Sequence, residues 1–129
     1  QGVPGGQGVK EQVAQPVSEV NSKVMGGVGL LLYRENDGAT IVKKIRAGSP
    51  ASIDGAVQIG DEVLSVDNVD VSTMSLEKTK SMVAGLEGTS VVIKFSRTTI
   101  ASTLFTAAVN TEVTRKFIRE SSTKWKGSL

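Results

Sequence analysis

The sequence predicts a single, mainly β domain of the α+β class. At 129 residues the chain has room for one domain of ordinary size. Between residues 17 and 97, short apolar runs of strand length alternate with glycine, proline and Asx turn signals, and only two segments carry helix-start signals. Apolar residues make up 39% of the chain and charged residues 22%, which are ordinary values for a globular protein, so we expect a buried core.

Three segments are expected along the chain. Residues 1–16 are rich in Gly, Pro and Gln without apolar periodicity, which predicts a flexible leader. Residues 17–97 form the folded domain, and residues 98–129 form a basic extension with five Lys and Arg against two Asp and Glu. Alternating apolar residues in the extension fit a strand, whereas Val113, Phe117 and the charges around them fit a helix, so both structures remain open.

Turn residues delimit the expected strands. The triplet at residues 36–38, Asn-Asp-Gly, predicts a hairpin turn, and Asp67 with Asn68 predicts a second turn between two short strands. In chain order, we expect strands at residues 17–24, 30–34, 40–45, 62–66, 69–71 and 91–96.

Serine caps predict the two helices. Ser49 precedes a proline that suits a first helical position, which predicts a short helix over residues 50–54. Ser75 caps the longer helix, from residue 76 to about residue 86, and Gly88 follows its end. At 100° per residue this helix has two apolar-leaning stripes, and one of them is free to line something other than the core. That stripe contains Leu76, Lys80 and Val83.

The chain contains neither His nor Cys. Disulfides, thiolate zinc sites, Cys nucleophiles and imidazole bases are therefore excluded within it, and we expect no metal, no cofactor and no enzymatic activity. Two Ser-x-x-Lys strings occur, but the companion elements of acyl-enzyme sites are missing. The lack of Cys favours an intracellular, reducing compartment, and no signal peptide or membrane-spanning segment is visible.

A glycine-rich turn at residues 26–29 leads into the strand at residues 30–34. It lacks the third glycine of G-x-G-x-x-G, no helix follows it, and no G-K-[ST] is present, so a nucleotide site is disfavoured. The N–H groups of such a turn converge beside the start of the strand. A concave array of backbone donors holds an anion, including the terminal carboxylate of a peptide.

Four segments occur together in a fixed order: Gly27-Val28-Gly29-Leu30, Gly48-Ser49-Pro50-Ala51, Gly60-Asp61-Glu62-Val63-Leu64-Ser65-Val66-Asp67 and the helix from Leu76. In these segments the sequence resembles the PDZ family, over most of residues 17–97. The resemblance implies a partly open antiparallel β-barrel of five to six strands capped by two helices. It also implies a module that binds the C-terminal peptides of partner proteins by β-strand addition between the second strand and the second helix.

The resemblance also implies which residues bind the peptide. The N–H groups of Val28, Gly29 and Leu30 would donate to the terminal carboxylate, and Lys23 would assist through an ordered water. The terminal side chain would enter an apolar pocket, where burying a Leu or Val contributes about 1.5–3 kcal/mol. Its lining would come from Val28, Leu30, Leu32 and Val83, and Leu31 of the same strand is included in the expected peptide site.

Leu76 stands where many family members have a His that selects Ser or Thr two residues before the ligand's end. We therefore expect an apolar ligand residue at that position. Lys80 provides an alternative, because its charge would select an acidic residue there instead.

Two other functions remain open. The domain could be the regulatory PDZ module of a serine protease of the C-terminal processing or high-temperature-requirement type, with the protease domain outside these residues. The basic tail with Trp125 could instead contact a lipid surface. Residues 1–97 carry about as many acidic as basic residues, so no nucleic-acid partner is expected. We expect a monomer, and the terminal Leu129 could enter such a groove itself.

Overall fold

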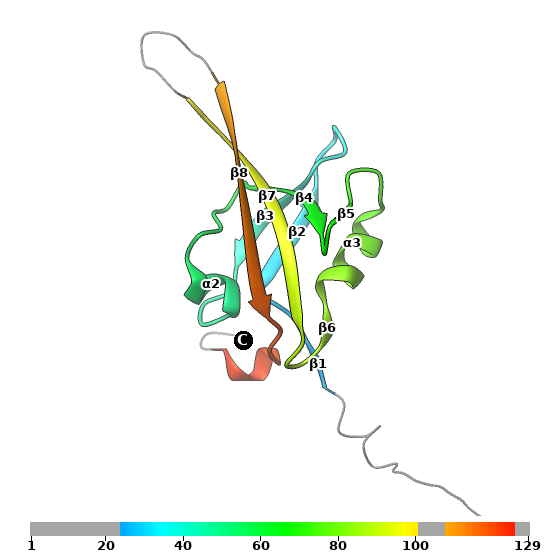
Figure 1. Cartoon of the computed structure of the whole chain (residues 1–129), viewed down its shortest axis with the longest axis vertical. Helices are drawn as coiled ribbons and strands as arrows, with labels where there is room; N and C mark the ends of the chain where they lie inside the picture. Colours follow the sequence, from blue (N-terminus) through cyan, green and yellow to red (C-terminus); the bar gives the residue numbers. More distant parts are fainter. Residues whose placement is uncertain (1–23, 101–107, 126–129) are drawn as a thin grey trace, which may run out of the picture.

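The computed structural model describes residues 24–100 and 108–125 (Figure 1). The expected leader, Lys23 and the end of the chain lie outside the described residues. The strand expected at residues 17–24 lies outside them except for Val24, which precedes the first observed strand.

An antiparallel sheet of six strands forms the body of the fold. Its spatial order is β2-β3-β4-β7-β8, and β5 pairs with β4 off this path. The sheet therefore has two edges, β2 and β8, and does not close into a barrel. These strands are β2 (Leu30–Arg34), β3 (Thr40–Ile45), β4 (Glu62–Val66), β5 (Val69–Asp70), β7 (Ser90–Ile100) and β8 (Ala108–Ile118). A separate two-stranded sheet joins β1 (Met25–Gly26) to β6 (Gly85–Leu86).

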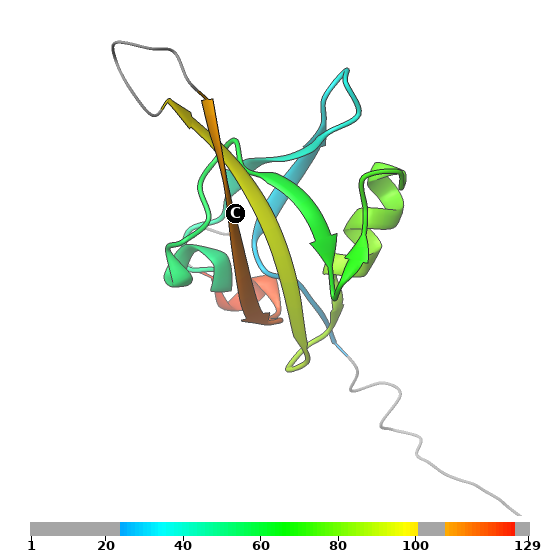
Figure 2. The same ribbon diagram turned by 45° about the horizontal axis from the view of Figure 1, so that its top comes forward.

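Two α-helices lie at opposite sides of the sheet in both views, α3 (Leu76–Val83) beside β2 and α2 (Pro50–Asp54) beside β8 (Figures 1 and 2). Both begin at the predicted serines, whose hydroxyls accept backbone N–H groups three residues later. A short 3₁₀ helix, η2 (Ser122–Lys124), follows β8. No helix within residues 24–100 and 108–125 is long and apolar enough to cross a membrane. The mainly β, antiparallel fold with two helices confirms the predicted class.

Small aliphatic side chains build most of the core, as the scarcity of aromatic residues requires. Phe95 of β7 and Phe117 of β8 are the large rings within it, at 1% and 3% exposure. Because Phe117 comes from β8, the basic extension contributes to the same core as the rest of the domain. The buried aliphatic side chains include Val28, Leu32, Val42, Val57, Val63, Val66, Val71, Val83, Val91 and Ile93.

Two predicted boundaries are wrong. The second helix ends at Val83 instead of about residue 86, because Ala84 adopts an extended backbone and the next two residues pair with β1. The strand predicted over residues 91–96 is longer, and β8 pairs with it along its whole length. This pairing answers the question left open for the extension, since residues 108–118 form a strand.

Two bidentate ion pairs tie loops and helices to the sheet. Arg97 of β7 donates to both carboxylate oxygens of Asp61 at 2.8 Å, and Arg115 of β8 holds Asp54 of α2 in the same way. Burial raises the pKa of Asp61, but the hydrogen bonds from Arg97 and from the Gln58 amide outweigh burial and bring the pKa below its ordinary value. Hydrogen bonding to Arg115 lowers the pKa of Asp54.

Replacing Asp61 with Asn should therefore change the acid stability of the domain. An Asp carboxyl titrates near pH 4 in an unfolded chain. Because the folded pKa lies lower, the pair stabilises the fold above about pH 4 and loses this contribution as the pH falls through the folded pKa. We expect Asp61→Asn to cost about 2 kcal/mol in urea unfolding at pH 6 and much less at pH 2.5. Glu112→Gln, which breaks an exposed pair with Lys94, is the control and should cost under about 0.5 kcal/mol. An equal loss for Asp61→Asn at both pH values would contradict this account.

Candidate functional site

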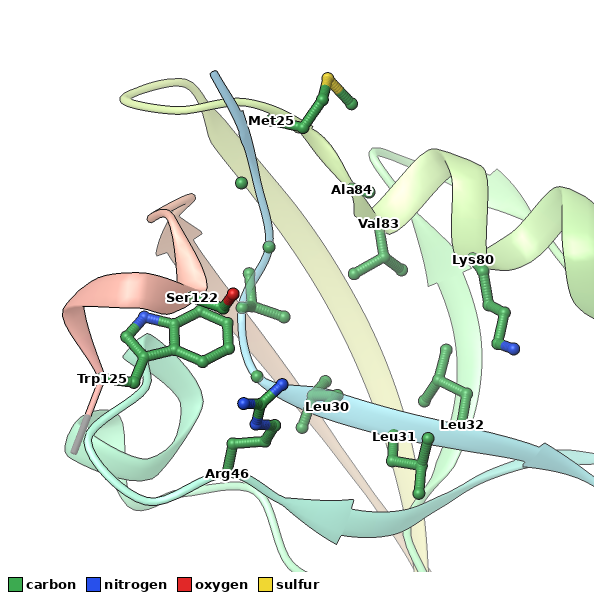
Figure 3. Close-up of a pocket in the computed structure, with 14 residues that line it drawn as sticks. Met25, Leu30, Leu31, Leu32, Arg46, Lys80, Val83, Ala84, Ser122 and Trp125 are labelled. Atoms are coloured by element: carbon green, nitrogen blue, oxygen red, sulfur yellow. The ribbon is translucent and has the colours of Figure 1, made fainter. Parts of the chain in front are cut away.

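A groove of about 330 Å³ runs between β2 and α3 and ends at the glycine turn (Figure 3). Its wall comes from four parts of the chain: the turn and β2, the end of β3, the second half of α3, and the segment after β8. The lining residues are Met25, Gly26, Gly27, Val28, Gly29, Leu30, Leu31, Leu32, Arg46, Lys80, Val83, Ala84, Ser122 and Trp125.

The backbone of β2 presents an open hydrogen-bonding edge to this groove. Arg46 donates its amide to the Gly29 carbonyl at 2.8 Å, and Leu30 lies opposite Ile45. In an antiparallel ladder this pattern marks a non-hydrogen-bonded pair, so the N–H and C=O of Leu30 point away from β3. The Val42 amide donates to the Asp61 carbonyl and the Val42 carbonyl accepts from the Gly60 amide, both at 2.8 Å, so both groups point away from β2. Leu32 pairs with Val42, and the N–H and C=O of Leu32 therefore also point to the open side.

The glycine turn adds further donors beside this edge. Within the described residues, the amides of Val28 and Gly29 donate to no protein acceptor, while their carbonyls accept from Ala51 at 3.0 Å and Arg46 at 2.8 Å. The turn is thus fixed through its carbonyls, and its N–H groups remain available. Gly29 has a φ of +89°, a left-handed conformation that favours glycine. This arrangement is suited to an anion at the start of β2.

Apolar side chains and positive charge line the rest of the groove. Leu32 and Val83 are 5% and 7% exposed, and Leu30 is partly buried between them and the turn. Arg46 stands near the glycine turn and Lys80 stands farther along α3 (Figure 3). Among the described residues that line the groove, these two carry positive charge and none carries a carboxylate. The groove is therefore suited to an apolar chain that ends in an anion.

Two arginines hold α3 at its distance from the sheet. Arg34 of β2 donates to the carbonyl of Met74, just before the helix. Arg119, only 8% exposed, donates to the carbonyls of Met82 and Val83 at 3.0 and 2.9 Å, at the helix end where carbonyls lack helical partners. A Cβ on Gly85 would lie 2.7 Å from the Arg119 guanidinium, so the glycine leaves room for it.

The segment after β8 completes the end of the groove that lies at the glycine turn. Glu120 exchanges two backbone hydrogen bonds with Gly27, at 2.9 and 3.0 Å. Trp125 is 7% exposed and lines the groove, so its ring is not presented to solvent as a lipid anchor would be. The Lys124 amine hydrogen-bonds the Glu87 carboxylate, which lowers the pKa of Glu87 and links η2 to the loop after β6.

The structure brings most of the residues expected to bind peptide into one groove. Val28, Gly29, Leu30, Leu31, Leu32, Lys80 and Val83 line it, whereas Lys23 lies outside the described residues. Leu76 is not among the lining residues. It lies seven residues before Val83, about 10 Å along the helix axis, and packs against the core. The expectation that Leu76 faces the ligand therefore lacks support from the groove geometry.

Sequence reasoning did not find Arg46, Trp125 and Ser122 as groove residues. Arg46 follows the Thr40–Ile45 strand, which contains two adjacent lysines, and a further basic residue there predicts only a solvated side chain. Trp125 is the sole tryptophan of the chain. The tendency of tryptophan to be largely buried is the one sequence signal that could have placed it in a groove. Neither residue is close in sequence to the glycine turn that it approaches in space.

Gly29→Ala should destabilise the domain far more than Gly27→Ala. A Cβ on Gly29 would lie 2.1 Å from the Cβ and Oγ of Ser49 and would occupy a left-handed backbone, so we expect a loss of more than about 2 kcal/mol. Gly27 has open space around the position of its Cβ, and alanine there should cost under about 1 kcal/mol. Urea unfolding of both variants measures the difference, and equal losses would refute the role assigned to Gly29.

Comparison with known proteins places this fold. In solved structures the chain is similar to the photosystem II D1 C-terminal processing protease, with a TM-score of 0.60, 21% identity and coverage of 75% of this chain but only 23% of that protein. It is also similar to the PDZ domain of the carboxy-terminal protease from Vibrio cholerae, solved in complex with peptide, with a TM-score of 0.57, 23% identity and coverage of 75% and 96%. A model of the PDZ domain family matches residues 17–95. The chain therefore belongs to the PDZ domain family.

Proposed function

We propose that this chain captures the C-terminal end of a partner protein by adding it as an antiparallel strand beside β2. The observation that carries the proposal is the open edge of β2, which leads from available amides at Val28 and Gly29 into a groove whose described lining residues include no carboxylate. The ligand's last residue would place its carboxylate at the turn and an apolar side chain against Leu30, Leu32 and Val83.

Physical magnitudes support a moderate affinity. Each hydrogen bond to the carboxylate contributes about 1.5–3 kcal/mol, and burial of one aliphatic side chain adds about 1.5–3 kcal/mol. Main-chain bonds to the outward groups of Leu30 and Leu32 fix the register of the peptide. The entropy of association offsets much of this sum. We therefore expect dissociation constants near 1 µM, which correspond to a binding free energy of about −8 kcal/mol.

Titration with matched peptides tests the proposal. Peptides that end in Leu or Val as free acids should shift the NMR signals of Val28 to Leu32 and of Val83. The same peptides with amidated ends should bind at least about tenfold more weakly, because they lack the negative charge to which the turn amides donate. A Ser-ended free acid controls for charge without apolar burial. Equal binding of the free acids and the amides, or no binding at all, would overturn the proposal.

Lys80 supports selection of an acidic residue upstream of the ligand's end. It lies on the groove wall beyond the apolar pocket and is exposed, whereas Leu76, which favoured an apolar residue there, packs against the core. A flexible ammonium on the groove wall can approach a ligand side chain without being buried itself.

Charge reversal at Lys80 tests this selectivity. Among Leu-ended peptides with Glu, Leu or Ser two residues before the end, the wild type should prefer Glu by about two- to fivefold at low salt. Lys80→Glu should invert that preference and leave the fold intact, since the side chain is exposed. Lys78→Glu, on the same helix but outside the groove lining, is the matched control and should leave the preference in place. A wild-type preference for Leu or Ser would show that Lys80 does not select the ligand.

A second candidate is that the module serves a serine protease. Both similar structures come from C-terminal processing or carboxy-terminal proteases, and each match spans more of the chain than residues 17–95. The coding sequence on either side of these residues tests it: a Ser/Lys or Ser/His/Asp constellation in the same reading frame supports the candidate, and its absence removes it.

A further inference from the structure

Arg46 lies next to the end of the groove where the carboxylate is expected. Its amide bonds to the Gly29 carbonyl at 2.8 Å, which places its backbone beside the turn that presents the Val28 and Gly29 amides. Its side chain lines the groove and extends toward the indole ring of Trp125 and the start of β2 (Figure 3). It is therefore the described cation nearest to the glycine turn along the groove wall, since Lys80 lies farther along β2 on the α3 side.

The ring of Trp125 orients this guanidinium. The central carbon of the Arg46 guanidinium lies 5.3 Å from the ring centroid, within the range of a cation–π contact. A guanidinium that packs by its face keeps the N–H donors at its edge, and those donors match a carboxylate in a bidentate fork. The contact therefore restricts the positions that the Arg46 side chain can take beside the groove.

Trp125 is in turn fixed to the glycine turn. Its Nε1 donates to Glu120 Oε1 at 3.1 Å, and the Glu120 backbone is paired with Gly27. A Cβ on Gly26 would lie 3.0 Å from the backbone of Glu120, so glycine permits this close approach. Residues 119–125, which we call the terminal segment, thus connect the turn to the Arg46 side chain, although they lie outside the family match.

We propose that Arg46, oriented by Trp125, binds the terminal carboxylate of the peptide, so that the terminal segment forms part of the carboxylate site. This inference rests on the proposed function. It assigns the contact with the peptide carboxylate to Arg46, the residue that directly follows β3. The expected role of Lys23 at the same carboxylate becomes the competing assignment. Trp125 acts as a positioning residue, because it contacts Arg46 and holds it in place.

The experiment measures the ratio of dissociation constants for one Leu-ended peptide in amidated and free-acid form. Arg46→Gln should reduce this ratio by about tenfold, mainly through weaker binding of the free acid, while binding of the amide changes little. Lys44→Gln removes one charge from an exposed residue outside the groove lining, so it is the matched control and should preserve the ratio. Lys23→Gln tests the competing assignment. Arg46 is only partly buried, so the glutamine variant should remain folded, as circular dichroism can verify.

Two Trp125 variants test the positioning role. Trp125→Phe retains an aromatic face and should keep most of the ratio, whereas Trp125→Leu removes it and should lower the ratio toward that of Arg46→Gln. Combining Trp125→Leu with Arg46→Gln should give no further loss, since both act on one contact.

The possible outcomes distinguish failure of the Arg46 assignment from failure of the proposed peptide-binding function. If the wild type binds neither peptide form, or binds both equally, the proposed function fails and the inference fails with it. If the wild type prefers the free acid and Arg46→Gln keeps that preference, only the assignment of Arg46 is overturned. Loss of the preference in Lys23→Gln, with no loss in Arg46→Gln, would assign the carboxylate to Lys23.

Discussion

The buried guanidinium of Arg119 holds the end of α3 to the end of β8, and the groove depends on this connection. Its hydrogen bonds to Met82 and Val83 satisfy carbonyls that the helix leaves open, and further bonds reach Thr89 and Ser90. A helix that packed fully onto β2 would cover the strand edge, and a helix that moved away would lose the apolar pocket. Arg34 makes the corresponding contact before the helix. The spacing between strand and helix is thus fixed at both ends by charged donors on carbonyl acceptors.

An edge strand with open backbone groups is ordinarily a liability, because it can pair with any extended chain. Here α3 covers one side of β2, and the glycine turn limits access at its start. A C-terminal peptide bound as proposed must therefore present an extended backbone, an apolar side chain and a carboxylate in the right order. The same constraints that protect the edge also provide selectivity, which is why the open groups of Leu30 and Leu32, the apolar wall and the charge distribution support one function together.

Local sequence signals predicted most elements, but they failed where a partner from another part of the chain decides the structure. The strands at β2, β3 and β4 and both helix starts follow from turn residues and serine caps. The end of α3 could not be predicted, because Gly85 and Leu86 leave the helix to pair with β1 and to make room for Arg119. Leu76 shares a helical stripe with Val83, yet periodicity does not reveal that the groove lies beside only the second half of the helix.

By itself, the sequence determined the chemistry that is available: no imidazole or thiol, a turn whose glycines permit unusual backbone conformations, and apolar runs of strand length. These properties are local, since they depend on residue type and near neighbours. Tertiary structure alone decided that Arg46 packs on Trp125 beside the glycine turn and that Arg119 bonds to the end of α3. Antiparallel pairing of β8 with β7 carries the terminal segment back to Gly27, and such long-range pairing depends on the whole sheet and not on any short pattern of residues.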